Sequence, residues 1–126
     1  YRTTGRVIST PALFEGRLYF GSGDGKLHCI TADSGKVVWK FRTDGGIWSS
    51  PCVTDSMIVV GSRSGKIYGI SIDGDLVWSF RTGALINATP VVLDGRIYCG
   101  SHDGFFYCLG EDTTAAVAAD EMNRSQ

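Results

Sequence analysis

A glycine-rich stretch, GSGDGK at residues 21–26, has the residue types of a loop that binds phosphate. Such a loop holds the anion with backbone amides at the start of a helix, and a lysine follows its glycines. The stretch recurs as GSRSGK at 61–66 and as GSHDGF at 100–105, and short alternating apolar runs follow each copy. We therefore interpret these glycines as turn residues of a repeat, not as a nucleotide site.

The other reactive side chains do not form a catalytic or metal-binding constellation. They are His28, His102, Ser9, Ser49, Ser50, Asp24 and Asp103. No serine has a histidine or aspartate at a fixed spacing, and the two histidines are isolated from other candidate groups. The two aspartates occupy equivalent turn positions, where aspartate is a common turn former. We expect no catalytic residue and no metal site in this chain.

Four cysteines occupy positions that ordinary core residues hold in the other repeats: Cys29, Cys52, Cys99 and Cys108. They contain no CxxC pair and no Cys/His spacing of a zinc site. We expect them to be reduced core residues, which favours a cytoplasmic location over a periplasmic or secreted one.

Composition excludes several classes of partner. The chain has 126 residues, of which 43% are hydrophobic, and its 12 basic residues are balanced by 13 acidic ones. This balance gives no electrostatic signature for a nucleic acid or an anionic membrane. No apolar run is long enough to span a bilayer. We expect a globular protein that binds neither.

Internal repeats with a period near 40 residues determine the predicted fold. Each unit is expected to contain four short strands, A to D, bounded by turn residues. The predicted ranges are 9–13, 49–53 and 88–92 for A, 17–22, 57–62 and 96–101 for B, 26–30, 66–70 and 105–109 for C, and 37–43 and 76–82 for D. Four-stranded units at this spacing are typical of an all-β fold, the blades of a β-propeller.

The repeated pattern, with S-[ST]-P at the start of strand A and SGKVVWxFxT around strand D, resembles the blades of the quinoprotein or PQQ-like propeller family. The resemblance covers residues 1 to about 112, with blades at about 7–46, 47–84 and 85–112. Residues 1–6 align with the end of a preceding blade, and 113–126 is expected to be a degenerate tail, helical or disordered. The position that matches the strand D tryptophan in this tail is Ala118.

The resemblance implies a tryptophan-docking motif that packs each blade against its neighbour. Here Trp39 and Trp78 hold the tryptophan positions, and Gly35 and Gly74 hold the glycine positions. The family's aspartate is replaced in both copies, so we expect weaker docking hydrogen bonds.

Catalytic members of the family hold a quinone over the ring centre with calcium, a catalytic aspartate and often a disulfide between adjacent cysteines. Nothing here matches these features, so we expect neither PQQ nor calcium.

Three blades, the last of them incomplete, cannot close a ring and leave two open edges. One interpretation is that further blades of a longer protein close it. The other is self-association, in which the N-terminal YRT of one copy completes the third blade of the next, so that a homodimer has six blades.

The D–A connections and the B–C turns should lie at one face, because successive strands alternate in direction. Candidate binding residues on this face are Arg6, Trp48, Arg63, Asn87 and His102. Tryptophan and arginine are enriched in interface hot spots, so Trp48 and Arg63 are the favoured pair.

We therefore predict a non-catalytic interaction or scaffold module that binds a protein or a small ligand on this face. One alternative is the carboxy-terminal propeller of a cytosolic acyl-CoA-synthetase-like adenylating enzyme. Others are a fragment of a PQQ-dependent dehydrogenase or of a propeller lipoprotein that assembles outer-membrane proteins.

Overall fold

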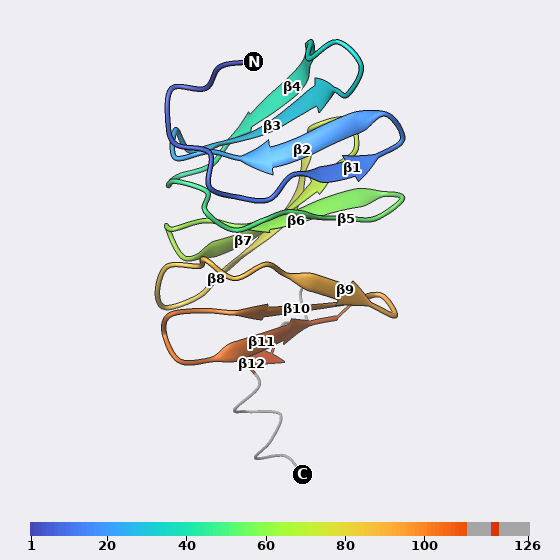
Figure 1. The fold of residues 1–126 in the computed structure, drawn as a ribbon. Helices are drawn as coiled ribbons and strands as arrows, with labels where there is room; N and C mark the ends of the chain where they lie inside the picture. The colour runs from blue at the N-terminus through green and yellow to red at the C-terminus, as the bar shows by residue number, and fades with distance from the viewer. Residues whose placement is uncertain (111–116, 119–126) are drawn as a thin grey trace.

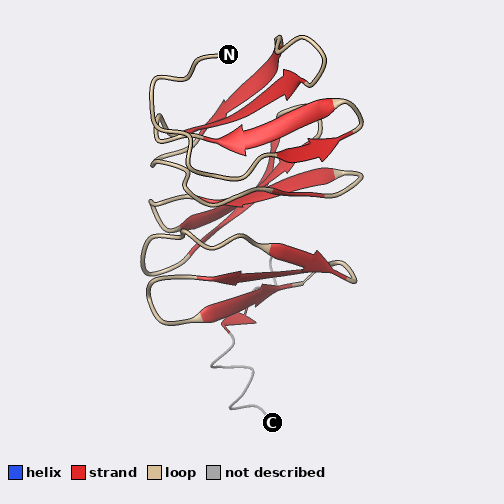
Figure 2. Ribbon diagram, in the orientation of Figure 1, coloured by secondary structure: helices blue, strands red, loops and turns tan. Residues whose placement is uncertain are grey.

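Three four-stranded antiparallel sheets are stacked as successive blades (Figures 1 and 2). The computed structural model describes residues 1–110 and 117–118, and every regular element within them is a strand. The first blade contains β1 (Ala12–Phe14), β2 (Arg17–Gly21), β3 (Lys26–Thr31) and β4 (Val37–Arg42). The second contains β5 (Cys52–Val53), β6 (Met57–Gly61), β7 (Lys66–Ser71) and β8 (Leu76–Arg81). The third contains β9 (Val91–Leu93), β10 (Arg96–Gly100), β11 (Phe106–Leu109) and β12 (Val117–Ala118).

The strands follow the chain order within each sheet, so each blade is a meander of strands A to D. The predicted all-β propeller architecture is confirmed, as an open arc of three blades. No helix in the described part of the chain has the length and apolar character needed to cross a bilayer.

Each strand A begins later than predicted, at the residue after a proline. Proline has no N–H to donate to a neighbouring strand. In the first two blades the serine two residues before the proline bonds to strand B through its side chain instead. The Ser9 hydroxyl accepts from Gly21 N–H at 2.9 Å, and Ser49 accepts from Gly61 N–H at 3.2 Å. These serines thus continue the sheet without being part of a strand.

The fourth strand of the third blade is short, and its register corrects the sequence alignment. Val117 pairs with Cys108, as Trp39 pairs with Cys29 and Trp78 with Gly69. The position that corresponds to tryptophan is therefore Val117 and not Ala118. Residues 117–118 form a strand where we expected a helical or disordered tail, and the rest of 113–126 lies outside the described residues.

The two faces of each sheet pack against different neighbours, because side chains alternate along a strand. We call the face toward the preceding blade the leading face and the opposite one the trailing face. Tyr19, Leu27 and Cys29 on the trailing face of the first blade pack against Ile58 and Ile70 on the leading face of the second. A second cluster repeats this arrangement between the second and third blades, from Val59, Ile67, Trp78, Ile97, Cys99 and Leu109.

A glycine at the end of strand B brings adjacent blades into close contact. A Cβ on Gly21 would overlap the side chain of Ile47, which lies in the following D–A connection. Gly61 has the same relation to Ile86. Both isoleucines are fully buried, so each fills a hole that only a glycine leaves open.

The tryptophans of the two strands D pack in different ways. Trp39 lies against the next blade, where its indole N–H donates to Ile72 O at 2.9 Å and its ring covers Gly74. Trp78 instead lies over Gly69 of its own blade, and its indole N–H points to Met57 Sδ at 3.3 Å. No atom of the described residues lies within 4 Å of a Cβ built on Gly35, the counterpart of Gly74 in the first blade.

The contribution of Trp39 docking is measurable with a pair of glycine substitutions. Gly74 and Gly35 both have positive φ, 92° and 68°, so alanine is strained at either position. At Gly74 the new Cβ would also lie 2.7 Å from the Trp39 ring. We expect Gly35→Ala to cost about 1 kcal/mol and Gly74→Ala at least about 2 kcal/mol in urea unfolding. Equal losses would contradict the docking contact.

Candidate functional site

One face of the stack is formed by the B–C turns and the D–A connections, on the left in Figure 1. We call it the loop face. Equivalent backbone hydrogen bonds tie each turn to the connection before it: Gly23 N–H to Arg6 O at 2.7 Å, Arg63 N–H to Gly46 O at 2.9 Å, and His102 N–H to Leu85 O at 3.0 Å. The turn residues 23, 63 and 102 thus occupy one repeated position beside the connection.

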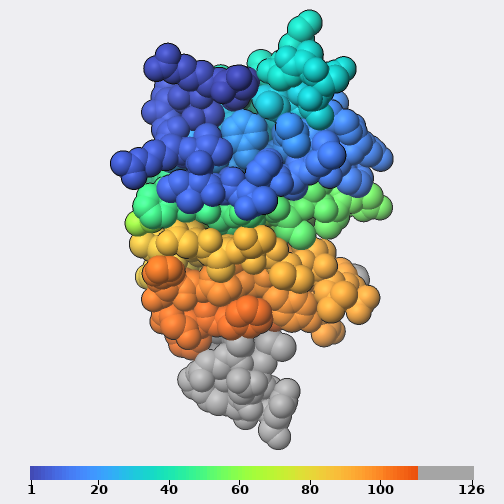
Figure 3. Space-filling model, viewed as in Figure 1, coloured from blue at the N-terminus to red at the C-terminus, as the bar shows by residue number. Residues whose placement is uncertain are grey.

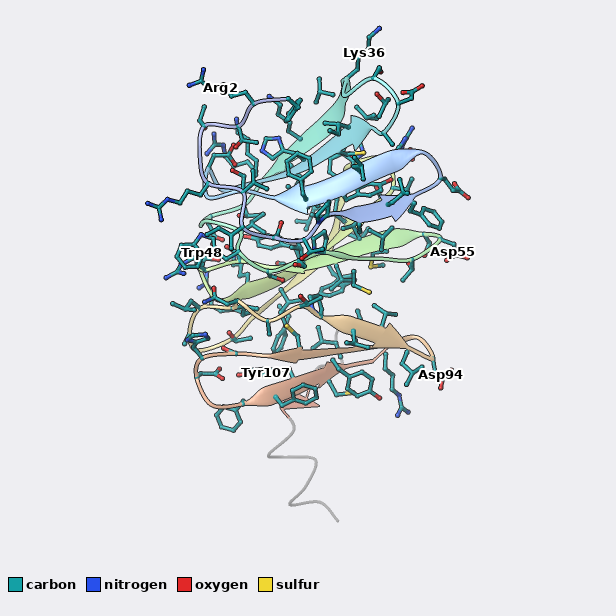
Figure 4. All side chains as sticks on the ribbon, in the orientation of Figure 1. Arg2, Lys36, Trp48, Asp55, Asp94 and Tyr107 are labelled. Carbon is teal, nitrogen blue, oxygen red and sulfur yellow. The ribbon has the colours of Figure 1, made fainter. Side chains whose placement is uncertain are left out.

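Trp48 and Arg63 are in contact on this face. The Arg63 guanidinium carbon lies 3.6 Å from the centre of the Trp48 ring, which is cation–π geometry. Trp48 is half-buried and lies with the loops at this side of the molecule (Figure 4). Stacking uses the flat surface of the guanidinium and leaves the N–H groups along its edge for an acceptor.

The other predicted binding residues lie on the same face without contacting this pair in a recorded interaction. Arg6 and His102 are exposed, and their backbone groups form two of the hydrogen bonds between turns and connections. Asn87 occupies the position of Trp48 in the next connection, and its Oδ1 is buried without a hydrogen-bond partner. The structure therefore brings two of the five predicted residues into direct contact.

A carboxylate binds the strand C aromatic residue at the loop-face end of every blade. In the first blade, His28 Nε2 lies 3.1 Å from Asp24 Oδ2. In the third, the Tyr107 hydroxyl donates to Asp103 Oδ2 at 2.6 Å. The second blade has Ser64 at that turn position. There the Tyr68 hydroxyl donates to Asp44 Oδ1 at 2.6 Å, from the D–A connection.

Hydrogen bonds and nearby cations both act on Asp44. Its partial burial works to raise its pKa, but hydrogen bonds from Ser64 and Tyr68 outweigh this and lower the pKa to about 2. Burial and the bond to Asp44 raise the pKa of Tyr68 to about 12. Lys66 and Arg81 also lie 3.6 and 3.5 Å from Asp44 Oδ2. The Asp44 carboxylate therefore stays ionised, and groups of the second blade bind both of its oxygens.

His28 is 2% exposed and stays neutral. Burial lowers its pKa, and the charge of Asp24 only partly offsets this. A proton on Nε2 explains both contacts, since Nε2 then donates to Asp24 while Nδ1 accepts from the Tyr1 hydroxyl at 2.9 Å. For Asp24, burial works to raise the pKa, but bonds from Lys26 N–H and His28 lower it overall.

Arg6 and Arg63 are cations of the loop face that form no salt bridge among the described residues. Asp44 lies within ion-pair distance of Lys66 and Arg81, whereas Asp24 binds the neutral His28. Asp103 accepts from Tyr107 and from two backbone N–H groups. No cluster of three or more potential metal ligands occurs in residues 1–110 and 117–118.

The sequence interpretation missed the shared carboxylate. Turn formation explains Asp24 and Asp103 in the sequence, and nothing there marks Asp44 as their equivalent. The sequence does contain a signal for this site. The turn position holds Asp24 in the first blade and Asp103 in the third, and in the second blade, where it holds Ser64, the preceding connection has Asp44. Only the structure shows that an aspartate in the turn and an aspartate in the connection reach the equivalent strand C residue.

The blades, their order and the repeated loop contacts define an open β-propeller of PQQ-like repeats. The chain belongs to the family described as outer membrane protein assembly factor BamB, whose model matches residues 2–104 and again 52–120. The predicted PQQ-like family is thereby confirmed. At this level the chain is a β-propeller interaction module.

Many solved structures are similar in fold, among them a BamB protein and a designed protein. BamB from Moraxella catarrhalis is 22% identical with a TM-score of 0.78, and the match covers 94% of this chain and 37% of that one. The chain thus spans little more than a third of that protein. The computationally designed Ika4 protein is 15% identical with a TM-score of 0.82, over 92% of this chain and 72% of that one. A comparison with curated proteins finds no match.

Moving the carboxylate of the second blade tests its shared role. Asp44→Gly removes the acceptor of Tyr68 and should cost about 1–3 kcal/mol in urea unfolding. Adding Ser64→Asp places a carboxylate where Asp103 stands in the third blade, which has Gly83 in its connection. The double variant should therefore regain most of the loss. Additive losses would show that the two positions are not equivalent.

His28 should make stability depend on pH. Its folded pKa lies below the usual 6.5, so the unfolded chain binds the proton more readily as the pH falls. Stability should therefore decrease between about pH 7 and about pH 5. His28→Tyr, which copies Tyr68 and Tyr107, should flatten this part of the curve in urea unfolding. His102→Asn is the matched control and should leave it unchanged; the reverse result would contradict the assignment.

Proposed function

We propose that the chain is an interaction module whose loop face binds an acidic segment of a partner protein. The stacked Trp48–Arg63 pair carries the proposal, because it combines an aromatic surface with guanidinium donors at one place. A carboxylate accepts from the guanidinium edge, and an apolar neighbour in the partner packs on the indole.

The charge distribution supports an acidic partner over a basic one. The carboxylates Asp24, Asp44 and Asp103 are engaged by groups of the blades themselves. Arg6 and Arg63 make no salt bridge among the described residues, so their charge is available to attract and orient an anionic segment.

The family match favours a second setting for the same module, as a scaffold in outer-membrane protein assembly, because the family's description names that process. The four unpaired cysteines support the cytoplasm instead, as expected for the propeller of an adenylating enzyme. We therefore keep the cytoplasm as the proposed compartment. Finding the full-length protein in the periplasm would favour the assembly scaffold.

A labelled peptide tests the proposed site. The probe is a fluorescein-labelled glutamate-rich peptide with a central phenylalanine, and binding is followed by fluorescence anisotropy. Trp48→Ala and Arg63→Ala should each weaken binding by about tenfold or more, as removal of a hot-spot residue does. Binding of the unmodified protein should also weaken as salt is added.

Two controls complete this experiment. Lys36→Ala removes a cation from the turn between β3 and β4, well apart from Trp48 in Figure 4, and should bind as tightly as the unmodified protein. The same peptide with glutamine in place of glutamate should bind weakly. Equal binding of the two peptides would overturn the acidic specificity, and no effect of the Trp48 and Arg63 substitutions would overturn the site.

A further inference from the structure

An apolar groove of about 290 Å³ lies on the leading face of the first blade. Its lining residues include Tyr1, Thr3, Val7, Leu18, Phe20 and Ile30. Four of them, Val7, Leu18, Phe20 and Ile30, lie forty positions before residues on the second-blade side of the interface between the first two blades, Ile47, Ile58, Val60 and Ile70. Tyr1 lies forty positions before Phe41, which packs on that interface from β4. The remaining lining residue, Pro11, corresponds in the same way to the buried Pro51. The groove is therefore one half of a blade-to-blade interface.

Val7 is an exposed side chain in this groove, at the position from which an isoleucine covers the strand B glycine of the preceding blade elsewhere in the chain. Its counterparts Ile47 and Ile86 are 0% exposed, because each covers the strand B glycine of the preceding blade. Val7 is 50% exposed, since no described blade precedes it. Val7 is β-branched like Ile47 and Ile86, but it has no strand B glycine of a described blade to pack on.

The trailing face of the third blade presents the complementary half. Gly100 corresponds to Gly21 and Gly61, yet among the described residues the one atom within 4 Å of a Cβ built on it is a ring carbon of Phe106, at 3.8 Å. Phe106 corresponds to Leu27, which is fully buried, but is itself 51% exposed. It stacks on Tyr98, the counterpart of Tyr19, with ring centres 6.2 Å apart. An unfilled glycine hole and an exposed aromatic pair therefore mark this face.

We propose that these two faces bind each other between copies of the chain, head to tail. The trailing face of the third blade of one copy occupies the groove of a second copy, with Val7 over Gly100. Both halves repeat, position for position, the interfaces already formed within the chain, which is why the occupant we assign is a second copy. Such a contact is heterologous, so two copies close a six-bladed ring if the rotation between blades permits, and otherwise extend further.

The first measurement is the mass of the unmodified protein by light scattering after size exclusion, over a range of concentrations. One chain has a mass of 13.6 kDa, and we expect a concentration-dependent species of at least twice that value. A monomer at every concentration would overturn the proposal, because the groove would then belong to another occupant, such as a further blade of a longer polypeptide.

Two charged variants test which faces meet. Val7→Arg disrupts the leading face and Phe106→Arg the trailing face, and both residues are half exposed, so each variant should keep its fold by circular dichroism. Each alone should be monomeric. Mixed, they retain one intact face each and should form a one-to-one heterodimer, a result specific to head-to-tail contact. Association of either variant alone, or failure of the mixture to pair while the unmodified protein associates, would overturn the proposal.

Ile8→Arg provides the matched control. Ile8 is 51% exposed and adjacent to Val7 but does not line the groove, so this variant should associate like the unmodified protein. Arg63→Ala should also leave association unchanged, which separates this surface from the peptide site on the loop face. Loss of association in the Ile8 variant would show a nonspecific effect of charge and count against the proposed groove.

Discussion

Close packing of each blade on the strand B glycine of its neighbour is the contact on which the rest of the structure depends. Gly21 and Gly61 leave holes that Ile47 and Ile86 fill, and these isoleucines lie in the D–A connections. One repeat unit cannot bury its apolar faces alone, and packing against its neighbours supplies the core. The same contact that buries the sheets therefore also fixes the path of each connection, and with it the loop face.

This constraint separates the scaffold from the residues available for binding. The backbone bonds between turn and connection are the same in all three blades, although the side chains at the turn position are Gly23, Arg63 and His102. Because this repeated bond uses backbone groups, the side chain at the turn position is free to differ. The position of Trp48 varies in the same way, and only the middle blade places an aromatic ring beside a guanidinium.

Sequence reasoning was most successful where one physical rule acts alone. Alternation of apolar residues located strands B, C and D to within a residue or two in the described blades, and the alternating strand direction grouped the loops correctly. The start of strand A was missed, because Ser9 and Ser49 replace backbone pairing with side-chain bonds. The different packing of Trp39 and Trp78 was missed as well, since it depends on which glycine each ring meets, Gly74 or Gly69.

The carboxylate at the strand C aromatic shows why internal comparison by position has a limit. Aligned one position at a time, Ser64 is a loss of the aspartate that the other turns carry. In the folded chain, Asp44 provides a carboxylate acceptor for Tyr68 from the D–A connection, because a backbone hydrogen bond holds that connection beside the turn. What the repeat maintains is an acceptor for a buried polar group, which would be costly to leave unpaired. This end of strand C requires an acceptor in every blade, and either the B–C turn or the D–A connection supplies it.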